Sequence, residues 1–377
     1  MRVTSAALLA AGAMLLPVPV QARQNVPLDG PGWDRSGEVS SATVDGRSAM
    51  RLRTGRAIRR DVVLEDGTID VDVRMPRLRA FVYLQFRMQN DREHEEIYLR
   101  PHKSGLPDAV QYSPVIQGAS YWQMYHGPGG TAAVEFPVDR WVRVRLVLSG
   151  PRAALFVGDT LTPVLVAPRL GREPAEGYLA LRSFQPAGSP DDPWPATYAN
   201  LLVRPGYIPF DFSGVTEPAP AAAGAIERWQ LSPAFAPDSG PVRSPPAVAS
   251  WTSVPADPGG LVMLGRHVAV PAGVRRPATA ARVILRADRE GPRAFDFAYS
   301  DEVSVFLNGS LLYSGNMSYS YDEPRREGLI ALGQETLYLP LRRGENELIM
   351  VVSETFGGWG LMARLPDGRG VEVVTPR

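Results

Sequence analysis

The sequence has no cysteine, a single lysine and no long hydrophobic segment after its first residues. Without cysteine the chain has neither a disulfide framework nor a lipid attachment site of the bacterial lipoprotein type. A membrane-spanning helix needs about 20 consecutive apolar residues, and nothing after the N-terminus supplies them. Stability must therefore come from ordinary hydrophobic cores, which a chain of 377 residues is long enough to build.

The N-terminus has the pattern of a secretory signal peptide. Arg2 precedes an apolar run over residues 6–16, and Val20-Gln21-Ala22 supplies the small residues that a signal peptidase requires. The run is too short to cross a bilayer. We expect cleavage after Ala22; removing these 22 of 377 residues would leave 355, located in the periplasm or secreted. The near absence of lysine, with Lys103 alone among 40 basic residues, indicates GC-rich coding and a bacterial source.

An excess of either charge is also missing. The sequence contains 40 basic and 40 acidic residues, so loss of Arg2 with the signal peptide gives a net charge of −1. Proteins that bind nucleic acids or anionic membranes through charge carry a basic excess. We therefore expect no nucleic acid as a partner and no membrane insertion.

Helical periodicity is scarce, and strand patterns take its place. Thirty-six prolines and thirty-six glycines interrupt the chain too often for many helices. Short runs instead alternate apolar and polar residues, as half-buried strands do. The clearest runs are residues 68–75, 80–88, 141–148, 153–157 and 177–183. This pattern predicts an all-β protein made of two β-sandwich (jelly-roll) domains.

The order of the first strands is characteristic. Gly32-Trp33 precedes the runs GTIDVDVRM and AFVYLQFRM; WVRVRLVLSGPRAALFVGD then forms two strands around a turn, and EGYLALRSF closes the set. Over roughly residues 28–205 this order resembles the laminin G-like, concanavalin A-like lectin/glucanase fold. The resemblance implies a lectin, a glycan hydrolase or an adhesion module, since the fold alone does not give the function. We assign residues 23–212 to this domain.

A change of composition follows. Residues 213–225, SGVTEPAPAAAGA, are rich in proline and alanine and predict an exposed linker between independently folding domains. Residues 226–377 form the second β domain. In it Asn308-Gly309 separates two alternating runs and predicts a type I′ hairpin, and residues 336–341 and 347–353 are expected to pair around residues 343–346.

Two segments of this second domain carry a further resemblance. SDEVSVFLNGSLLYSG and LPLRRGENELIMVVSETFGGWG resemble galactose-binding-like jelly rolls. Such domains flank catalytic modules in many glycoside hydrolases and carbohydrate esterases. In FGGWG, Trp359 is either a sugar-stacking platform or a plug of the core, and we favour the plug because most tryptophans are largely buried. Residues 318–321 (SYSY) are the better candidate for an exposed aromatic loop.

The candidate binding site lies around residues 94–126, which hold three of the four histidines. As a strand, EEIYLRPH places its polar residues on one face and Ile97 and Leu99 on the other. Pairing with residues 80–88 would add three more polar side chains to that face. The candidate ligand-binding residues are Tyr83, Gln85, Arg87, Glu96, Tyr98, Arg100, His102, Trp122 and Tyr125. We expect an exposed or cleft-lining face that stacks on sugar rings and binds their hydroxyls; the alternative is a solvated face joined by cross-strand pairs.

Catalysis is the sharper hypothesis. A glycosidase needs two carboxylates at one site, but Glu95 and Glu96 are neighbours and must face opposite ways. The E-x-D-x-E or E-x-D-x-x-E motif of glucanases with this fold is absent. Asp70 and Asp72 could share a face, although TIDVDV is also an ordinary outer strand. If the protein is an enzyme, Glu96 with His102 would carry the acid–base chemistry.

No cofactor and no transition metal are expected. His94, His102 and His126 do not form a closely spaced ligand pair, and cysteine is missing. Structural calcium is the metal we consider, because families of both resembled folds often carry it. Its candidate ligands are Asp191, Asp192, Asp322 and Glu323, for which turn-forming or solvated acids are the alternative.

These patterns together predict an exported, non-catalytic protein that recognises a carbohydrate or glycoconjugate. One alternative is a carbohydrate-active hydrolase or lyase with its site around Glu96, which a pair of carboxylates across the groove would favour. The other is a structural or protein-interaction module, which a flat exposed face without a pocket would favour. An aromatic floor without a carboxylate pair favours recognition.

Overall fold

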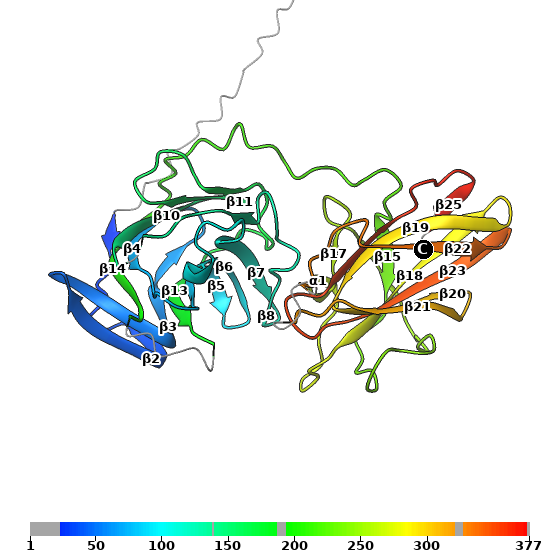
Figure 1. Cartoon of the computed structure of the whole chain (residues 1–377), viewed down its shortest axis with the longest axis horizontal. Helices are drawn as coiled ribbons and strands as arrows, with labels where there is room; N and C mark the ends of the chain where they lie inside the picture. Colours follow the sequence, from blue (N-terminus) through cyan, green and yellow to red (C-terminus); the bar gives the residue numbers. More distant parts are fainter. Residues whose placement is uncertain (1–22, 138, 187–193, 321–326, 375–377) are drawn as a thin grey trace, which may run out of the picture.

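The computed structural model describes residues 23–137, 139–186, 194–320 and 327–374. This part of the chain consists of antiparallel β-strands in two lobes that lie side by side (Figure 1). Its helical elements are α1 (Leu264–His267) and the 3-10 turn η1 (Pro101–Lys103). Across the same residues no helix is long and apolar enough to cross a membrane. The predicted all-β sandwich class is confirmed.

The first lobe is a curled antiparallel sheet that runs β12-β11-β10-β4-β14-β3-β13-β5-β6-β7-β8, with β1 beside β14, β2 beside β3 and β9 beside β7. Its strands are β1 (Gln24–Asn25), β2 (Trp33–Val44), β3 (Arg47–Leu64), β4 (Gly67–Arg74), β5 (Phe81–Asn90), β6 (Glu93–Leu99), β7 (Val110–Ile116), β8 (Ala119–Ser120), β9 (Thr131–Ala132), β10 (Trp141–Ser149), β11 (Arg152–Val157), β12 (Leu165–Ala167), β13 (Gly177–Phe184) and β14 (Ala196–Pro205).

Alternation along each strand builds the first core. In β4, Ile69, Val71 and Val73 point inward and are at most 1% exposed, whereas Asp70 and Asp72 lie on the outer face. Successive side chains of a strand point to opposite faces, so the apolar halves of all these strands meet inside the curl. This inner packing fixes which residues are left to form a site on the outside.

The second lobe contains two sheets. Their orders are β16-β15-β18-β23-β20-β21, with β25 beside β18, and β17-β24-β19-β22. The strands are β15 (Arg228–Leu231), β16 (Thr252–Pro255), β17 (Val262–Met263), β18 (Ala278–Ala287), β19 (Gly291–Ser300), β20 (Glu302–Leu307), β21 (Ser310–Asn316), β22 (Glu335–Leu341), β23 (Gly344–Ser353), β24 (Gly360–Arg364) and β25 (Val371–Val374). The hydrophobic faces of both sheets pack into one core.

Two local predictions for this lobe are confirmed. Asn308 and Gly309 both have positive φ, 51° and 82°, and join β20 to β21 as the Asn-Gly signal predicted. Trp359 is 1% exposed and donates its indole N–H to the carbonyl of Val352 at 3.0 Å, so it is a plug of the core.

The prediction that residues 336–341 pair with 347–353 is wrong. β22 pairs with β19, while β23 lies between β18 and β20 in the other sheet. The connection is therefore a crossover between sheets. Asn346, fully buried, holds it: its amide donates to the carbonyls of Arg342 and Gly344 at 2.8 and 3.1 Å and accepts from the Arg342 N–H at 2.9 Å.

The lobes are joined by residues 213–225, the long connection at the top of Figure 1, and every residue of this described segment is exposed or half-buried. They also meet directly. Ile116 and Tyr121, from the end of β7 and the loop after β8, are buried in the core of the second lobe. We call this contact between the lobes the seam. Gln117 adds three hydrogen bonds across it: its side-chain amide donates to the carbonyls of Gly265 and Val268 (2.6 and 2.8 Å) and accepts from the Val270 N–H (2.9 Å).

Candidate functional site

The expected pairing of β5 with β6 forms the centre of the candidate site. Tyr83 lies opposite Tyr98, and Gln85 lies opposite Glu96. On the other side of these strands five residues enter the first core, as predicted: Val82, Leu84, Phe86, Ile97 and Leu99. The alternation along the two strands therefore separates an apolar inner side from a polar and aromatic outer side.

Four rings form a continuous layer on the outer side. Phe81 lies 6.5 Å from Tyr83, 6.1 Å from Tyr98 and 6.1 Å from Phe184 of β13, measured between ring centroids. Tyr83 and Tyr98 are 5.1 Å apart. We call Phe81, Tyr83, Tyr98 and Phe184 the aromatic face. Phe81 and Phe184 are half-buried, while Tyr83 and Tyr98 are 8% and 5% exposed.

Two guanidinium groups stack on this face. Arg182 lies over the ring of Tyr83 at 4.7 Å, and Arg100 lies over the ring of Tyr98 at 5.2 Å. Guanidinium groups pair with aromatic rings through the quadrupole of the ring and keep hydrogen-bond donors at its edge. The face thus combines ring surface with fixed donors.

A buried carboxylate adjoins the aromatic face. Glu96 is 1% exposed and accepts hydrogen bonds from the Gln85 amide and the Ser120 hydroxyl, both at 3.0 Å; His94 Nε2 lies 3.6 Å from it. Burial alone would raise the pKa of Glu96, but the hydrogen bond and charge of His94 and the charge of Arg182 lower it below its ordinary value. Glu96 is therefore ionised near neutral pH.

Gln111 of β7 connects this face to the seam between the lobes. Its carbonyl oxygen accepts from the Tyr98 hydroxyl at 2.9 Å and from Arg100. Its amide donates to the backbone carbonyls of Trp122 and Tyr125 at 2.7 and 3.1 Å. Trp122 and Tyr125 are thus brought to the site by their backbone.

The rings of these two residues point elsewhere. Tyr125 packs edge-on against Tyr112 at 5.1 Å, and its hydroxyl lies 3.4 Å from the Met263 sulfur. Trp122 contacts rings of the second lobe. From the sequence alone it could not be predicted that Trp122 and Tyr125 reach the site with their backbone carbonyls and not with their rings.

Two other predicted ligand-binding residues, Arg87 and His102, lie away from the position expected for them. Arg87 has φ of 48° within an irregularity of the β5–β6 register, and it donates to the Glu65 carbonyl (2.8 Å), Asp66 (3.0 Å) and the Gly150 carbonyl (2.8 Å). The prediction that Arg87 shares the face of Glu96 is wrong, because an extra residue in a strand reverses the alternation beyond it.

His102 also lies off the strand. Pro101 starts η1 after β6 has ended at Leu99, and the His102 ring packs on Phe81 at 5.2 Å with Nδ1 3.1 Å from the Ala80 carbonyl. Burial, helped by the charges of Arg79 and Arg100, lowers the pKa of His102 to about 4. The proposed pairing of His102 with Glu96 is therefore wrong; the histidine beside Glu96 is His94, which the two-residue spacing on one strand could have indicated.

The polar part of the face is more enclosed than predicted. Gln85, Glu96 and Gln111 are each at most 1% exposed, because Ser120 and the loop that follows it cover them. Of the expected exposed or cleft-lining face of Glu96, Tyr98 and their neighbours, the half-buried margin of Phe81, Arg182 and Phe184 is what keeps surface. Sequence alternation shows which side a residue faces but not what lies over it.

The neighbouring carboxyl group, Glu95, lies on the inner side. It accepts hydrogen bonds from the Tyr112 hydroxyl at 2.6 Å and from the Arg172 N–H at 3.0 Å. Burial raises the pKa of Glu95 to about 7, against the lowering effect of these hydrogen bonds and of Arg87. As the sequence predicted, Glu95 and Glu96 cannot serve one site.

Metal ligands do not converge among the described residues, where no group of three His, Cys, Asp or Glu side chains could hold an ion. His126 instead lies with Nε2 2.8 Å from the Ile330 carbonyl, at the seam. The four candidate calcium ligands, Asp191, Asp192, Asp322 and Glu323, lie outside the described residues.

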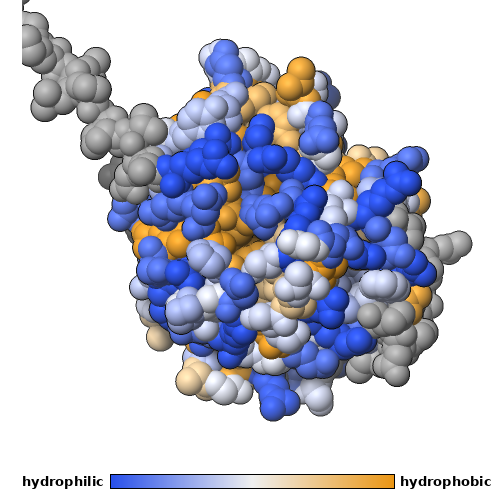
Figure 2. Space-filling model, turned by 90° about the vertical axis from the view of Figure 1, so that its left-hand side faces the viewer, coloured by the Kyte–Doolittle hydropathy of each residue, from blue (hydrophilic) through white to orange (hydrophobic). Residues whose placement is uncertain are grey.

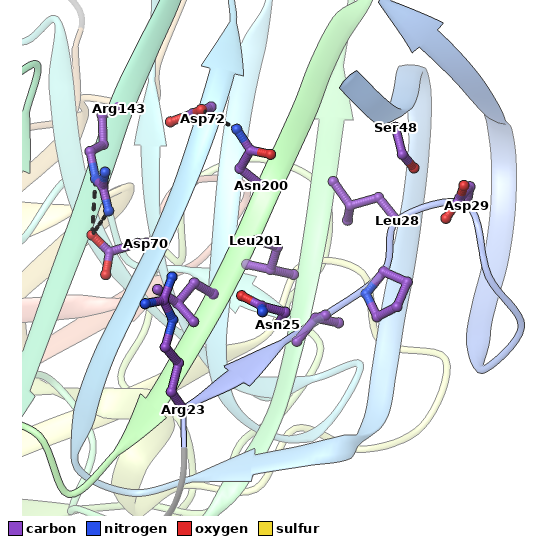
Figure 3. Close-up of a pocket in the computed structure, with 13 residues that line it drawn as sticks. Arg23, Asn25, Leu28, Asp29, Ser48, Asp70, Asp72, Arg143, Asn200 and Leu201 are labelled. Carbon is purple, nitrogen blue, oxygen red and sulfur yellow. Dashed lines mark hydrogen bonds and ion pairs between the residues drawn. The ribbon is translucent and has the colours of Figure 1, made fainter. Parts of the chain in front are cut away.

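A separate cavity of about 480 Å³ lies on the outer face of β4, between β1, β10 and β14 (Figure 3). Asp70 and Asp72 both line it, so they do share a face. Asp70 is buried and receives Arg143 (3.1 Å), Arg145 (2.7 Å) and Arg204 (2.8 Å). Burial opposes ionisation, yet the hydrogen bonds and charges of Arg145 and Arg143 lower the pKa of Asp70.

Asp72 is likewise engaged. It accepts from Arg47 and Asn200, each at 2.7 Å (Figure 3 shows the contact with Asn200). Carboxylates that are held by arginine and amide donors of the protein are poorly placed to act as the acid and nucleophile pair of a glycosidase. The end of the molecule remote from the second lobe is mostly hydrophilic, with hydrophobic surface confined to patches between polar residues (Figure 2). We therefore regard the aromatic face, and not this cavity, as the candidate site.

Comparison with known proteins gives limited likenesses. No family model matches the chain, and no curated protein does. Among solved structures it is similar to the carbohydrate-binding module CBM66 from Bacillus subtilis (16% identity, 45% of this chain and 93% of that one, TM-score 0.32). It is also similar to a β-glucanase from Bacillus licheniformis (12%, 49% and 98%, TM-score 0.37) and to a Bacillus subtilis protein of unknown function with a galectin-like fold (12%, 49% and 95%, TM-score 0.35). With TM-scores below 0.5, these likenesses assign neither a ligand nor an activity.

Proposed function

We propose that the chain is an exported protein that recognises a carbohydrate or glycoconjugate, without catalysis, through the aromatic face of its first lobe. The aromatic face with its stacked arginines carries this proposal. Ring faces suit the C–H side of a pyranose, and guanidinium and carboxylate groups suit its hydroxyl edges. Phe81 and Phe184 of this face, and Arg182 stacked on it, keep surface for such contacts.

The runner-up is a carbohydrate-active hydrolase or lyase that uses Glu96. An ionised Glu96 suits a base or a nucleophile, but a glycosidase also needs an acid across the scissile bond. On the strand of Glu96 itself, Glu95 has the raised pKa of such an acid, yet it lies on the inner side of β6 with Tyr112. The geometry therefore favours recognition over hydrolysis.

Export and location belong to the same proposal. The first 22 residues are interpreted as a cleaved signal peptide, with the mature protein periplasmic or secreted; N-terminal sequencing of the protein expressed with its leader checks this. A mature chain that still begins at Met1 would contradict it. The galactose-binding-like assignment of the second lobe, residues 226–377, is likewise proposed.

The test compares two variants with the native protein on a glycan array, with sugar release measured in parallel. Arg182→Met keeps length but removes the donors stacked on Tyr83, and we expect about 1–3 kcal/mol of lost affinity, the scale of a hydrogen bond to a charged group. Glu96→Gln tests catalysis; because Ser120 and the loop after it cover Glu96, it should change the affinity less than Arg182→Met does. As a matched control, Arg60→Met removes a guanidinium that stacks on Tyr178, on the neighbouring part of β13 (5.3 Å), and should leave binding unchanged.

The outcomes separate the two functions. Sugar release by the native protein that falls by at least about 10²-fold in Glu96→Gln, the usual scale of acid–base assistance, would establish the enzyme instead. Binding that is unaffected by both Arg182→Met and Glu96→Gln would place the ligand elsewhere on the molecule.

A further inference from the structure

Three rings from three separate segments meet at the seam between the lobes. Trp122, in the loop after β8, lies 5.6 Å from Tyr319 and 6.2 Å from Phe356, and these two rings are 5.9 Å apart. Tyr319 follows β21 and Phe356 follows β23, so the second lobe supplies two of the rings. We call Trp122, Tyr319 and Phe356 the seam triad.

Hydrogen bonds hold the loop that carries Phe356. The buried carboxylate of Asp301 accepts from the N–H groups of Phe356 (2.7 Å) and Thr355 (2.6 Å) and from the Thr355 hydroxyl (2.6 Å). Gln123 N–H donates to the Gly357 carbonyl at 3.2 Å, and its side chain accepts from the Ser300 hydroxyl at 2.7 Å. Hydrogen bonds therefore hold the backbone at Phe356 and at the residue after Trp122.

The glycines of FGGWG permit this arrangement. A Cβ on Gly357, where φ is 101°, would lie 2.8 Å from the indole nitrogen of Trp122 and 2.5 Å from the Gln123 side chain. A side chain there would force the two lobes apart. The motif thus serves the close approach of Trp122 and Gln123 to the second lobe, while Trp359 fills the core behind it.

The triad keeps a large exposed ring surface. Phe356 is 57% exposed and Tyr319 is 37% exposed, whereas most large rings of the described chain are buried. A cluster of exposed aromatic rings on a rigid support is typical of a binding surface. The polar groups beside it are neutral or internally bonded, as Ser318 and Thr355 (3.3 Å apart) and Asp301 show.

The triad is also linked to the aromatic face by hydrogen bonds. The Tyr98 hydroxyl bonds to Gln111, and Gln111 bonds to the carbonyl of Trp122. Two hydrogen bonds through the buried Gln111 therefore link the two aromatic surfaces inside the protein. An extended chain of sugar units, but not a single ring, could contact both.

We propose that the seam triad is a second subsite, built jointly by both lobes, that stacks on a distal ring of a neutral oligosaccharide whose other end occupies the aromatic face. This inference rests on the proposed function. Neutral chains are specified because the triad offers ring surface and the polar groups described beside it are bonded within the protein. The second lobe then acts as part of the binding site and not as a separate module.

Chain length provides the test. The probes are the disaccharides and hexasaccharides of β-1,3-, β-1,4- and α-1,4-linked glucose, titrated by calorimetry against the full mature protein. Phe356→Ala and Tyr319→Ala should each weaken binding of the hexasaccharide about 3- to 10-fold, the scale of one ring contact, and leave the disaccharide unchanged. Phe356→Tyr should restore the hexasaccharide affinity. Tyr338→Ala, which removes a tyrosine that is 72% exposed on β22, is the matched control and should change neither.

Each other outcome counts against the inference. Hexasaccharide binding that Arg182→Met weakens but Phe356→Ala and Tyr319→Ala leave intact overturns the second subsite alone. Equal losses for disaccharide and hexasaccharide in Phe356→Ala would make the triad the primary site. A change in oligomeric state of Phe356→Ala, measured by light scattering, would assign the triad to a protein contact. If none of the probes binds the native protein, the proposed function and this inference fail together for neutral glucans.

Discussion

Glu95 and Glu96 show what one position along a strand decides. Both are buried, but Glu96 faces a histidine and an amide while Glu95 faces the core beside Tyr112. Burial raises the pKa of Glu95, whereas neighbouring positive groups lower that of Glu96. Two identical side chains therefore differ in charge near neutral pH, because each strand face has its own dielectric surroundings and partners.

The raised pKa of Glu95 predicts a pH-dependent stability. Its folded-state pKa of about 7 lies above the ordinary value of 4.5, so its contribution to folding is complete below pH 4.5 and is lost as the pH rises through 7. Between pH 5 and pH 8 the loss should be about 2–3 kcal/mol. Glu95→Gln should remove that part of the slope, as measured by urea unfolding at both pH values.

The exposed Glu173, whose side chain is 90% accessible, supplies the control variant for this measurement. Glu173→Gln should retain the native slope. An unchanged slope in Glu95→Gln would show that Glu95 is already ionised in the folded protein at pH 5.

At the scale of elements, local sequence patterns predicted where the strands lie better than which strands pair with each other. The Asn308-Gly309 turn joins neighbouring strands, since a two-residue turn with positive φ leaves the chain no other course. The connection at residues 342–346 has similar composition, yet it passes between sheets. Asn346 holds this connection by bonding the backbone of Arg342 and Gly344.

Asn346→Ala should therefore destabilise the second lobe. The change would remove three hydrogen bonds between the buried Asn346 side chain and the backbone of Arg342 and Gly344, at about 0.5–1.5 kcal/mol net for each, since the other residues of the turn are exposed or half-buried. We expect a loss of about 2–4 kcal/mol in the free energy of unfolding, measured with denaturant. Glu345→Ala, next in sequence but 62% exposed and paired with Arg286, should cost less than about 1 kcal/mol. Equal losses in the two variants would deny Asn346 this role.

At the scale of the whole molecule, the two lobes are bound by more than their linker. The exposed segment 213–225 remains the predicted site of proteolysis, and independent folding of the two domains remains a prediction. Separating the two domains would also break the seam, since Ile116 and Tyr121 of the first lobe are buried in the core of the second. Separated halves would expose these side chains to water.

Elastase, which cuts after small residues such as those at 221–225, should nick the linker and leave two fragments that elute together in size-exclusion chromatography. Gln117→Ala should weaken that association, because its three hydrogen bonds cross the seam. Gln89→Ala, which removes contacts within the first lobe only, should not. Native halves that separate at micromolar concentration would contradict the seam, and loss of cooperative unfolding in both fragments would contradict the domain boundary.

The sequence by itself determined the all-β class, the strands and the inward-facing residues. These follow from alternation and turn chemistry, which are local and depend on a few neighbouring residues. It also placed Tyr83 and Tyr98 on one face with Glu96, and it separated Glu95 from Glu96. For the same reason it went wrong at Arg87, where one extra residue in β5 relative to β13 reverses the alternation without any mark in composition.

Tertiary structure alone decided which residues cover the polar side of β5 and β6 and which distant residues meet beside it. The enclosure of Gln85 and Glu96 by Ser120, the choice of His94 over His102, and the meeting of Trp122 with Tyr319 and Phe356 all join residues that local patterns treat separately. Trp122 and Phe356 are more than 200 positions apart, and no periodicity relates them. Their contact depends on how two lobes dock, which is set by the shape and burial of whole surfaces and not by the order of neighbouring side chains.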